Sequence, residues 1–394
     1  MTDAVLQSHR PTATWKREKA IASAMPVAHG PQVTCEPTDP QTWETIASTF
    51  DGICQEQTYR FSKLRWPSMT YEPRIFKIND EIVGGTLMMI QKLPLGLGSI
   101  AISKWGPMLR DSTRPDRDAL YRGMVDLIVK EYAQQRRAFI SILPRASTVR
   151  ENPEFLALRE MGFRPGGNVA FPERYLVNLQ ISDAQQRAGF DQKWRYHLKR
   201  SEAAGLTFEH ADATAMKDFD RLYHAMSERK KFPDYSAYNS LHALFELPEA
   251  LRPELFLVRK DGVIVAGAVI FKAGDTASYM YGATTDEALP LRAGYFMHWH
   301  VIRWLKENTR TRWYDLGGTD GFMGLHQFKK GMVGQDGVIA PLPPIAHFAA
   351  STWSLAIGCS AFAARDFVLA IKHRLQLRLK DQARPDQQRN SGTR

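Results

Sequence analysis

The feature that most constrains this chain is an internal repeat, in which one order of secondary structure is predicted twice. A strand, a tight polar turn and a longer apolar strand occupy residues 74–90, and the same pattern returns over residues 255–271. Such a pattern is typical of a β-hairpin. Each hairpin precedes a strand, a helix with an apolar period and another strand, at 98–103, 119–135 and 139–142, then at 277–281, 296–306 and 313–316. A spacing of roughly 180 residues is too long for a solenoid, so we expect two related domains packed together.

Composition and charge narrow the classes of partner. With 394 residues, of which 44% are hydrophobic and 24% charged, the chain is long enough for two ordinary globular domains. The net charge of +10 favours an anionic partner, such as nucleic acid, a phosphorylated substrate or an acidic membrane face. A generally basic proteome and solubility are the alternative explanations of that charge.

Several classes of site and location are disfavoured. Cys35, Cys54 and Cys359 match no metal spacing or disulfide framework, which indicates a reducing compartment. His298 and His300 lie two apart in a predicted helix and face different directions, so we predict core roles and no metal. We see neither a secretory signal nor an uninterrupted apolar run of about 18 residues, so we expect a cytoplasmic protein.

The chain divides into five predicted segments. We expect a disordered leader over 1–30, a first domain over 31–180, a second over 181–345, a basic amphipathic helix over 346–380 and a disordered tail over 381–394. In the C-terminal helix an apolar stripe begins at Trp353, Ile357 and Ala361, and eight Lys or Arg follow from Arg365 onward against three Asp. Binding to an anionic membrane and packing on the protein's own core both remain open for it.

A strand end and a nearby pair of lysines suggest an active-site floor. The strand ends in Gly317-Gly318, and a loop is expected to deliver Lys329 and Lys330 beside Gly331. Glycine lets a backbone approach a ligand closely, and paired cations hold a phosphate or a developing oxyanion. A surface turn is the alternative. Asp315 fits a structural role, bonded to backbone N–H groups, better than the role of a base.

A basic segment opens the second predicted domain. In a helix, Arg195 and Lys199 share one face, with Lys193 and Tyr196 beside them. Cations interleaved with aromatic residues can hold a diphosphate or an RNA backbone. A solvated basic helix face explains the same residues without a ligand.

The repeated order resembles the GNAT acyltransferase fold, and further motifs resemble the Fem family of aminoacyl-tRNA-dependent transferases. The matching segments are Tyr314–Gly318, Gly324–Met332, Lys193–Leu206 and, more weakly, Gln57–Arg65. Met332 stands where the family has an aromatic residue, and Phe61 and Arg65 replace the usual Trp and Lys. The resemblance covers about residues 40–345 and lacks the inserted coiled-coil arm of the glycyl-transferring members. The fold class it implies is α+β, with two tandem GNAT-like domains of mixed sheets flanked by helices.

The resemblance implies an enzyme that moves an aminoacyl group from aminoacyl-tRNA to an amine of a peptidoglycan-type precursor, phosphorylated or lipid-linked. It makes Lys329 and Lys330 the catalytic candidates. Its substrate-binding candidates are Arg65, Lys193, Arg195, Tyr196, Lys199, Gly317, Gly318 and Phe328. The expected location is the cytoplasm, with peripheral contact at the inner membrane face left open. No resident cofactor is implied.

The competing donor is acetyl- or acyl-coenzyme A, with a polysaccharide, lipid or small-molecule amine as acceptor. GNAT enzymes that use it hold the pyrophosphate on a glycine-rich helix start. The stretch 291–296 contains only Gly294, and the stretch 114–118 contains no glycine, which favours aminoacyl-tRNA. A non-catalytic RNA-binding or envelope scaffold protein is the third hypothesis. The amino acid, the acceptor, the general base and the oligomeric state are not fixed by the sequence.

Overall fold

The protein contains two β-sheets, each flanked by helices. The computed structural model describes residues 32–168, 172–230 and 238–365. Apart from Met1–Gly30, the chain is one compact unit, Pro31–Arg394, and every contact discussed below lies within it. The predicted disordered leader and tail fall outside the described residues. None of the helices in the described ranges combines the length and apolarity that spanning a membrane requires.

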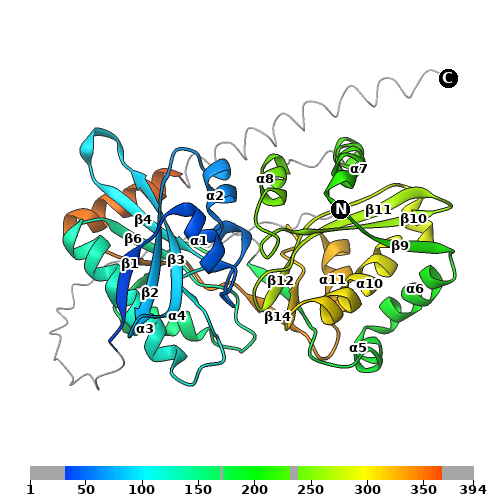
Figure 1. Cartoon of the computed structure of the whole chain (residues 1–394), viewed down its shortest axis with the longest axis horizontal. Helices are drawn as coiled ribbons and strands as arrows, with labels where there is room; N and C mark the ends of the chain where they lie inside the picture. Colours follow the sequence, from blue (N-terminus) through cyan, green and yellow to red (C-terminus); the bar gives the residue numbers. More distant parts are fainter. Residues whose placement is uncertain (1–31, 169–171, 231–237, 366–394) are drawn as a thin grey trace, which may run out of the picture. The chain divides into compact units, whose positions relative to one another are not determined.

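The first sheet and its helices form what we call the first lobe (Figure 1). Its strand order is β1 (Thr34–Pro37), β2 (Thr70–Ile78), β3 (Glu81–Lys92), β4 (Ser99–Lys104), β6 (Phe139–Leu143), β15 (Ala346–Phe348) and β7 (Arg164–Pro165), and β5 (Met108–Leu109) also pairs with β3. Its helices are α1 (Pro40–Ala47), α2 (Tyr59–Arg65), α3 (Arg117–Ile128), continued by a π-helical turn over Val129–Gln135, and α4 (Pro153–Glu160). A short 3-10 turn over Gln55–Gln57 precedes α2.

The second sheet and its helices form the second lobe. Its strand order is β14 (Val338–Pro341), β8 (Glu173–Asn178), β13 (Trp313–Asp315), β12 (Thr276–Thr284), β11 (Val263–Phe271), β10 (Glu254–Lys260) and β9 (Leu206–Ala211). Its helices are α5 (Asp183–Gly189), α6 (Gln192–Glu202), α7 (Met216–Lys230), α8 (Leu241–Phe245), α9 (Ala288–Leu291), α10 (Ala293–Asn308) and α11 (Met323–Val333). The predicted α+β class with two GNAT-like halves is confirmed.

The duplication extends to the turns of the two hairpins. Asn79 and Asp80 join β2 to β3, Asp261 and Gly262 join β10 to β11, and all four have positive φ. Positive φ at both central residues marks the type I′ turn, whose twist suits a two-residue hairpin. Both hairpins also shift register just before the turn, at Phe76/Lys77 and at Val258/Arg259.

Two strands cross the boundary that the sequence suggested. The strand β8 precedes residue 180, yet it lies in the second sheet between β13 and β14. The strand β15 follows residue 345, yet it lies in the first sheet between β6 and β7. Each sheet is therefore completed by a strand from beyond its predicted segment, so neither lobe is a continuous stretch of chain.

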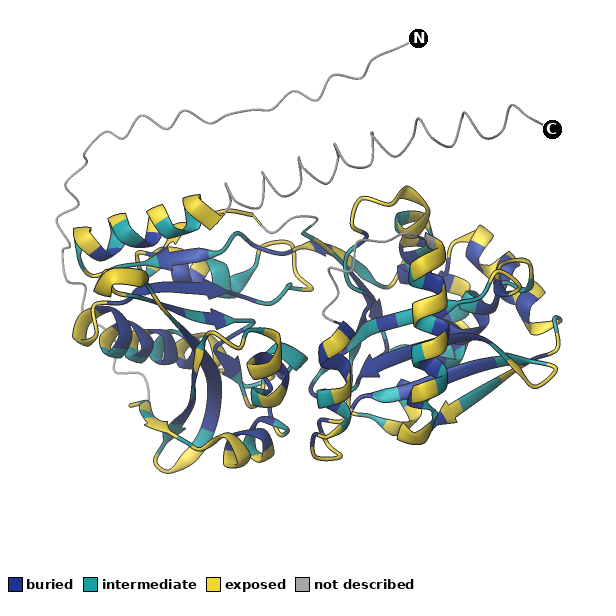
Figure 2. Ribbon diagram, turned by 90° about the horizontal axis from the view of Figure 1, so that it is seen from above, coloured by how far each residue is buried: buried dark blue, intermediate teal, exposed yellow. Residues whose placement is uncertain are grey.

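The C-terminal helix differs from the prediction in its start and in its buried face. Residues 346–348 form β15, and the helix occupies 352–365, where the described chain ends. The face that packs on the first lobe contains Ser354, Gly358 and Phe362, with Phe362 5.9 Å from Phe139 between ring centroids. Trp353 of the predicted apolar stripe is 63% exposed. Figure 2 shows exposed residues along the outer side of this helix.

Candidate functional site

The site begins where two parallel strands of the second lobe separate. β12 and β13 pair over three residue pairs that end at Ser278 and Asp315. β12 then continues along β11, whereas the chain after Asp315 turns away through Gly317, whose φ is +74°. A residue with a side chain is strained at such a φ, which explains a glycine at this position.

A buried lysine fills this turn. Lys329 on α11 is 6% exposed, and its Nζ donates hydrogen bonds to the carbonyl oxygens of Leu316 at 2.6 Å and Gly318 at 2.5 Å. Burial, reinforced by Arg174, lowers the pKa of Lys329 to about 8 against the opposing effect of Asp315. At neutral pH the side chain is therefore largely a cation, and it is held in one position by two backbone carbonyls.

Aromatic rings surround the residue next to this cation. The ring of Phe328 lies 4.9 Å from Tyr295, 5.6 Å from His298 and 6.2 Å from Trp194, between centroids. His298 Nδ1 lies 3.1 Å from the hydroxyl of Tyr314. Burial, with the nearby Lys329, lowers the pKa of His298 to about 3, so its imidazole is neutral. A low-dielectric wall of this kind strengthens electrostatic interactions made by Lys329.

The carboxylate of Asp315 has a structural role. Its Oδ2 accepts hydrogen bonds from Nε and Nη2 of Arg174 at 3.0 and 2.7 Å, and its Oδ1 accepts one from the N–H of Gly317 at 2.8 Å. The predicted hydrogen bonding to backbone N–H groups is confirmed, and the ion pair with Arg174 adds to it. Both oxygens are occupied, which disfavours Asp315 as a base.

A cavity of about 100 Å³ lies beside this ion pair, between the lobes. From the first lobe it is lined by Cys54, Glu56, Trp105 and Arg145, among others, and from the second by Arg174, Ser278, Trp313 and Asp315. Because Asp315 both lines the cavity and begins the turn that holds Lys329, the cavity and the lysine adjoin the same strand end.

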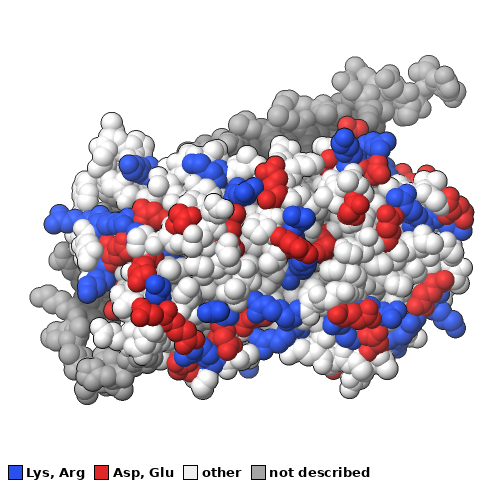
Figure 3. Space-filling model, in the orientation of Figure 1, with Lys and Arg blue, Asp and Glu red and all other residues white. Residues whose placement is uncertain are grey.

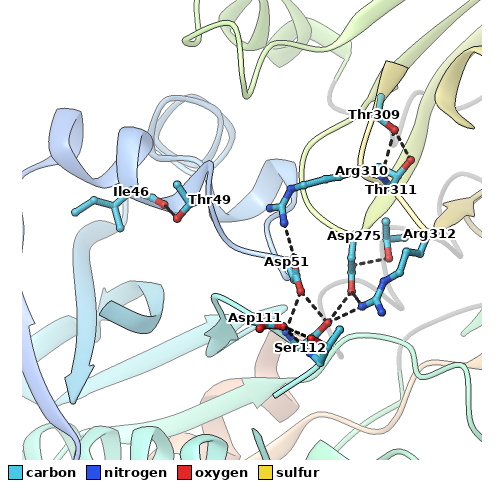
Figure 4. A network of polar contacts seen from close by, with 12 residues as sticks. Ile46, Thr49, Asp51, Asp111, Ser112, Asp275, Thr309, Arg310, Thr311 and Arg312 are labelled. Atoms are coloured by element: carbon cyan, nitrogen blue, oxygen red, sulfur yellow. Dashed lines mark hydrogen bonds and ion pairs between the residues drawn. The ribbon is translucent and has the colours of Figure 1, made fainter. Parts of the chain in front are cut away.

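A polar network beside this cavity fastens the lobes to each other (Figure 4). Asp51 of the first lobe accepts hydrogen bonds from Arg310 at 2.6 Å and from the backbone and hydroxyl of Ser112 at 2.8 and 2.9 Å. Asp275 of the second lobe accepts one from Arg145 at 2.9 Å. The backbone N–H of Asp275 also donates to the carbonyl of Asp51 at 2.9 Å.

The structure brings together four of the predicted site residues: Gly317, Gly318, Phe328 and Lys329. The prediction of a loop for the lysines is wrong, because both lie on α11. Consecutive residues of a helix point in different directions, so Lys330 is exposed while Lys329 is buried. Lys330 therefore does not enter the turn with Lys329.

The predicted basic helix forms as α6, but its cations do not lie with Lys329 in the turn after β13. Lys193, Arg195, Tyr196 and Lys199 are exposed on α6. Arg195 donates to the backbone carbonyls of Ala188 at 2.8 Å and of Phe190, at the α5–α6 junction. Figure 3 shows Lys and Arg interspersed with Asp and Glu on the face drawn there. A role for α6 in phosphate binding stays a prediction.

The weakest motif divides into a structural and an exposed part. Gln57 is fully buried, where its side chain accepts the N–H of Leu87 at 2.7 Å and donates to the carbonyl of Lys104. Phe61 is buried in the core, whereas Arg65 is exposed at the end of α2. Arg65 does not line the cavity between the lobes.

Sequence reasoning missed Arg145, Arg174 and Tyr279. Arg174 follows Glu173 at the start of β8, directly before three buried residues, which is only a weak signal for a buried ion pair. Arg145 follows the end of β6 as Gly317 follows the end of β13, so superposing the two copies of the repeat would have drawn attention to it. Tyr279, 4.9 Å from His298 between ring centroids, gives no sequence signal of its own.

Comparison with known proteins gives four findings. The family model of the acetyltransferase (GNAT) domain matches residues 188–330. A 92-residue stretch is 30% identical to lipid II:glycine glycyltransferase of Staphylococcus aureus, covering 21% of this chain and 22% of that protein. The crystal structure of FemX superposes with a TM-score of 0.65 at 16% identity, over 80% of this chain and 97% of that one. A conserved protein of unknown function from Bacteroides thetaiotaomicron superposes at 0.52, with 12% identity, over 80% of this chain and 98% of that one.

The chain has the GNAT fold. It spans about a fifth of the length of the curated relatives that it matches, with 22% of the relative covered.

The starts of helices α3 and α10 are occupied by side chains. At the start of α10, the ring of Tyr295 lies 4.9 Å from His197 and 5.2 Å from Trp194, between centroids. At the start of α3, Asp116 stands at the N-cap and pairs with Arg114 at 2.9 Å. The Arg114–Asp116 ion pair occupies the start of α3, and packed rings restrict close approach of a phosphate to α10. These observations disfavour a pyrophosphate cradle of the coenzyme A type.

Proposed function

We propose that this protein transfers an aminoacyl group from aminoacyl-tRNA to an amine of a peptidoglycan-type envelope precursor. The observation that carries the proposal is the buried Lys329 cation, held by the Leu316 and Gly318 carbonyls at the end of β13. The likeness to lipid II:glycine glycyltransferase and to FemX supports this choice of reaction. The packed starts of α3 and α10 support an RNA-borne donor over coenzyme A.

The reaction needs one new bond and one broken bond. The acceptor amine attacks the ester carbonyl of the donor, a C–N bond forms, and the ester C–O bond breaks to release the terminal ribose hydroxyl. The proton lost by the amine is recovered by that hydroxyl. Negative charge develops on the carbonyl oxygen in between, and a fixed ammonium in a dry site stabilises such an oxyanion. Lys329 is the residue that we assign to this task.

Removal of the amine proton is assigned to the substrates. Asp315 has both oxygens engaged, and burial lowers the pKa of His298 far below neutrality. A protein base normally contributes about 10² to 10⁴-fold. We therefore expect no single carboxylate substitution to cost more than about 10³-fold. Orientation of a preactivated ester against an amine supplies most of the acceleration.

A donor and acceptor screen tests the proposal. The purified protein is incubated with a pool of charged tRNA and with nucleotide- or lipid-linked muropeptides, and mass spectrometry follows the acceptor. We expect one added amino-acid residue mass, abolished by RNase treatment of the donor. An acyl group added from acetyl- or acyl-coenzyme A would instead establish the N-acyltransferase alternative, which the GNAT family match also allows. No product from either donor would leave a non-catalytic RNA-binding or scaffold role.

We further propose that the first lobe rests on an anionic membrane surface. Leu95 and Leu97, at the tip between β3 and β4, are 95% and 38% exposed, and Trp353 is 63% exposed. All except Leu95 border one hollow of about 670 Å³, together with Arg137. Exposed apolar side chains beside cations suit an interface of lipid headgroups.

Vesicle flotation tests this location. The protein is mixed with vesicles of neutral phosphatidylcholine, or with the same lipid containing an anionic phosphatidylglycerol fraction. We expect flotation with the anionic vesicles, weakened several-fold by Leu95→Ser and Trp353→Ser together. Equal flotation of wild type and variant would contradict the assignment of this surface.

A further inference from the structure

Two arginines from opposite lobes line the cavity beside Asp315, and the proposed reaction assigns neither of them a contact with a substrate. Arg145 follows β6 of the first lobe, and Arg174 lies on β8 of the second. Their side chains are 26% and 25% exposed, so each guanidinium is mostly enclosed yet reaches the cavity. Arginine presents several N–H donors in a planar fork, which matches a carboxylate.

Each guanidinium is anchored on one edge and leaves donors over. Arg174 places Nε and Nη2 on the same oxygen of Asp315, and Nη1 has no partner among the described residues. Arg145 gives Nη2 to Asp275 at 2.9 Å and makes a long contact of 3.4 Å from Nη1 to the carbonyl of Asp51, while Nε has no partner in the described chain. The acidic partners thus hold both guanidinium groups in place, while each group keeps an N–H donor without a partner among the described residues.

The same cavity also contains a carboxylate. Glu56 lies 3.1 Å from Lys104, and its side chain is 13% exposed. Burial by itself would raise the pKa of Glu56, but the ion pair and hydrogen bond with Lys104 outweigh it, so the pKa falls below its usual value and the group stays ionised. The lining therefore offers cationic donors and an anionic acceptor within one small space.

Size and sign together define the ligand group. A volume of about 100 Å³ suits a compact charged group, such as an amine-bearing carbon with its carboxylate. Charges of both signs suit a zwitterion, whose carboxylate meets the arginines while its ammonium approaches Glu56. The cavity adjoins the strand end that holds Lys329, where the acceptor amine must react.

We propose that Arg145 and Arg174 bind a carboxylate of the acceptor, and that the acceptor amine stands on the carbon that carries this carboxylate. The inference rests on the proposed function, which it deepens by naming the class of acceptor. A diamino acid with a carboxylate beside its reactive amine fits this site, whereas a simple alkylamine such as a lysine side chain does not.

Calorimetric binding of three defined acceptors tests the inference. The probes are nucleotide-linked muropeptide stems that carry meso-diaminopimelate, the same residue with its distal carboxylate amidated, or lysine at the third position. We expect the wild-type protein to bind the free-acid stem at least about tenfold more tightly than the other two, since charge-assisted bidentate bonds are lost from both.

Substitution then assigns the preference to the arginines. Arg145→Gln removes the charge, and we expect it to weaken binding of the free-acid stem about tenfold or more while leaving the amidated stem unchanged. Arg174→Lys keeps the charge opposite Asp315 and loses the fork, so it should reduce the preference in part. Arg221→Gln, at an exposed position on α7, is the matched control. Thermal melts confirm that each variant is folded.

The possible results distinguish failure of the carboxylate site from failure of the proposed transfer reaction. Equal affinity for the three stems, or an equal loss for all three in Arg145→Gln, overturns the carboxylate site. A carboxylate preference that depends on Arg145, without any residue transferred from aminoacyl-tRNA, retains the site and rejects the proposed reaction.

Discussion

The two lobes share one order of elements, but different side chains lie beside their pairs of parallel strands. In the first lobe β4 and β6 stay paired over five residue pairs, and buried Gln57 bridges the Leu87 N–H to the Lys104 carbonyl. In the second lobe β12 and β13 pair over only three, and Lys329 enters the turn that follows. The first lobe thus has a neutral amide, Gln57, at this place, and the second lobe has a cation, Lys329.

The two copies of the fold therefore have different roles. A neutral amide that hydrogen-bonds two backbone groups stabilises the fold without adding a charge. A buried ammonium loses solvation free energy, but it produces a strong local electrostatic field. The first lobe therefore serves as a scaffold that contributes Arg145 to the cavity between the lobes. The second lobe holds the group that we assign to the chemistry.

The largest expected effect is on Lys329. Lys329→Met removes the cation, and we expect kcat/KM for aminoacyl transfer to fall about 10² to 10³-fold, the usual loss for an oxyanion-stabilising donor. Lys330→Met decides which of the two predicted lysines acts, and its exposed position predicts a change of about twofold or less. Lys217→Met on α7 is the control for loss of a surface charge. A larger loss at Lys330 than at Lys329 would reverse our assignment.

The pH dependence sharpens the same contrast. With the pKa of Lys329 lowered to about 8, the ammonium is lost as the pH rises through that value, so kcat/KM should decline above it. Lys329→Arg retains its charge and should move the decline to higher pH. An unchanged decline in this variant would point to another group.

Stability should respond in the opposite direction over that window. Since the pKa of Lys329 is about 8 in the folded protein and 10.5 ordinarily, the unfolded chain binds more protons between these values. The free energy of unfolding therefore gains from this residue as the pH rises from about 8 to 10.5. Urea titrations of wild type and Lys329→Met should differ in this slope.

In the first lobe the matching residue should affect stability and not chemistry. Gln57→Leu leaves the Leu87 N–H and the Lys104 carbonyl unpaired in the interior, and we expect a loss of about 1–3 kcal/mol for each. Transfer by the folded fraction should remain near the wild-type rate. Gln134→Leu, at an exposed position, provides the comparison in thermal melts. A catalytic loss in Gln57→Leu without destabilisation would break the division between the lobes.

The smallest effects concern the contacts that join the lobes. A double-mutant cycle on Asp51 and Arg310 should give a coupling of about 1 kcal/mol or less, because the Arg310 side chain is 50% exposed. A cycle on Asp275 and Arg145, whose side chains are 14% and 26% exposed, should give a larger one. Urea unfolding of the four single and two double Ala variants measures both. Equal couplings would show that exposure does not govern this interface.

Local patterns were sufficient to predict the repeat and part of the site. Hairpins depend on alternation and on turn residues within a few positions, so β2–β3 and β10–β11 follow directly from the sequence. Gly317, Gly318 and Phe328 lie beside Lys329, as their motif suggested. The helical conformation of Lys329 and Lys330 was missed because Gly324 and Gly331 suggested a loop.

Tertiary packing explains what local patterns missed. A Cβ at Gly331 would lie 3.2 Å from Trp194 Cδ1, so this glycine permits close approach of α11 to α6 and does not mark a loop. The cavity likewise arises only when the chain after β6 and the strand β8 line it from the two lobes, which no local pattern encodes. Strands as short as β15, Ala346–Phe348, carry too little alternation to be assigned to either sheet in advance.

The exchange of β8 and β15 has a consequence for how the protein is made. During synthesis the first sheet emerges early but lacks the strand between β6 and β7 until residues 346–348 leave the ribosome. Until then β6 and β7 present unpaired backbone groups. This open sheet edge persists while the second lobe is being synthesised. The last described strand, β15, thus completes the first sheet, so the folding of the two lobes is completed together.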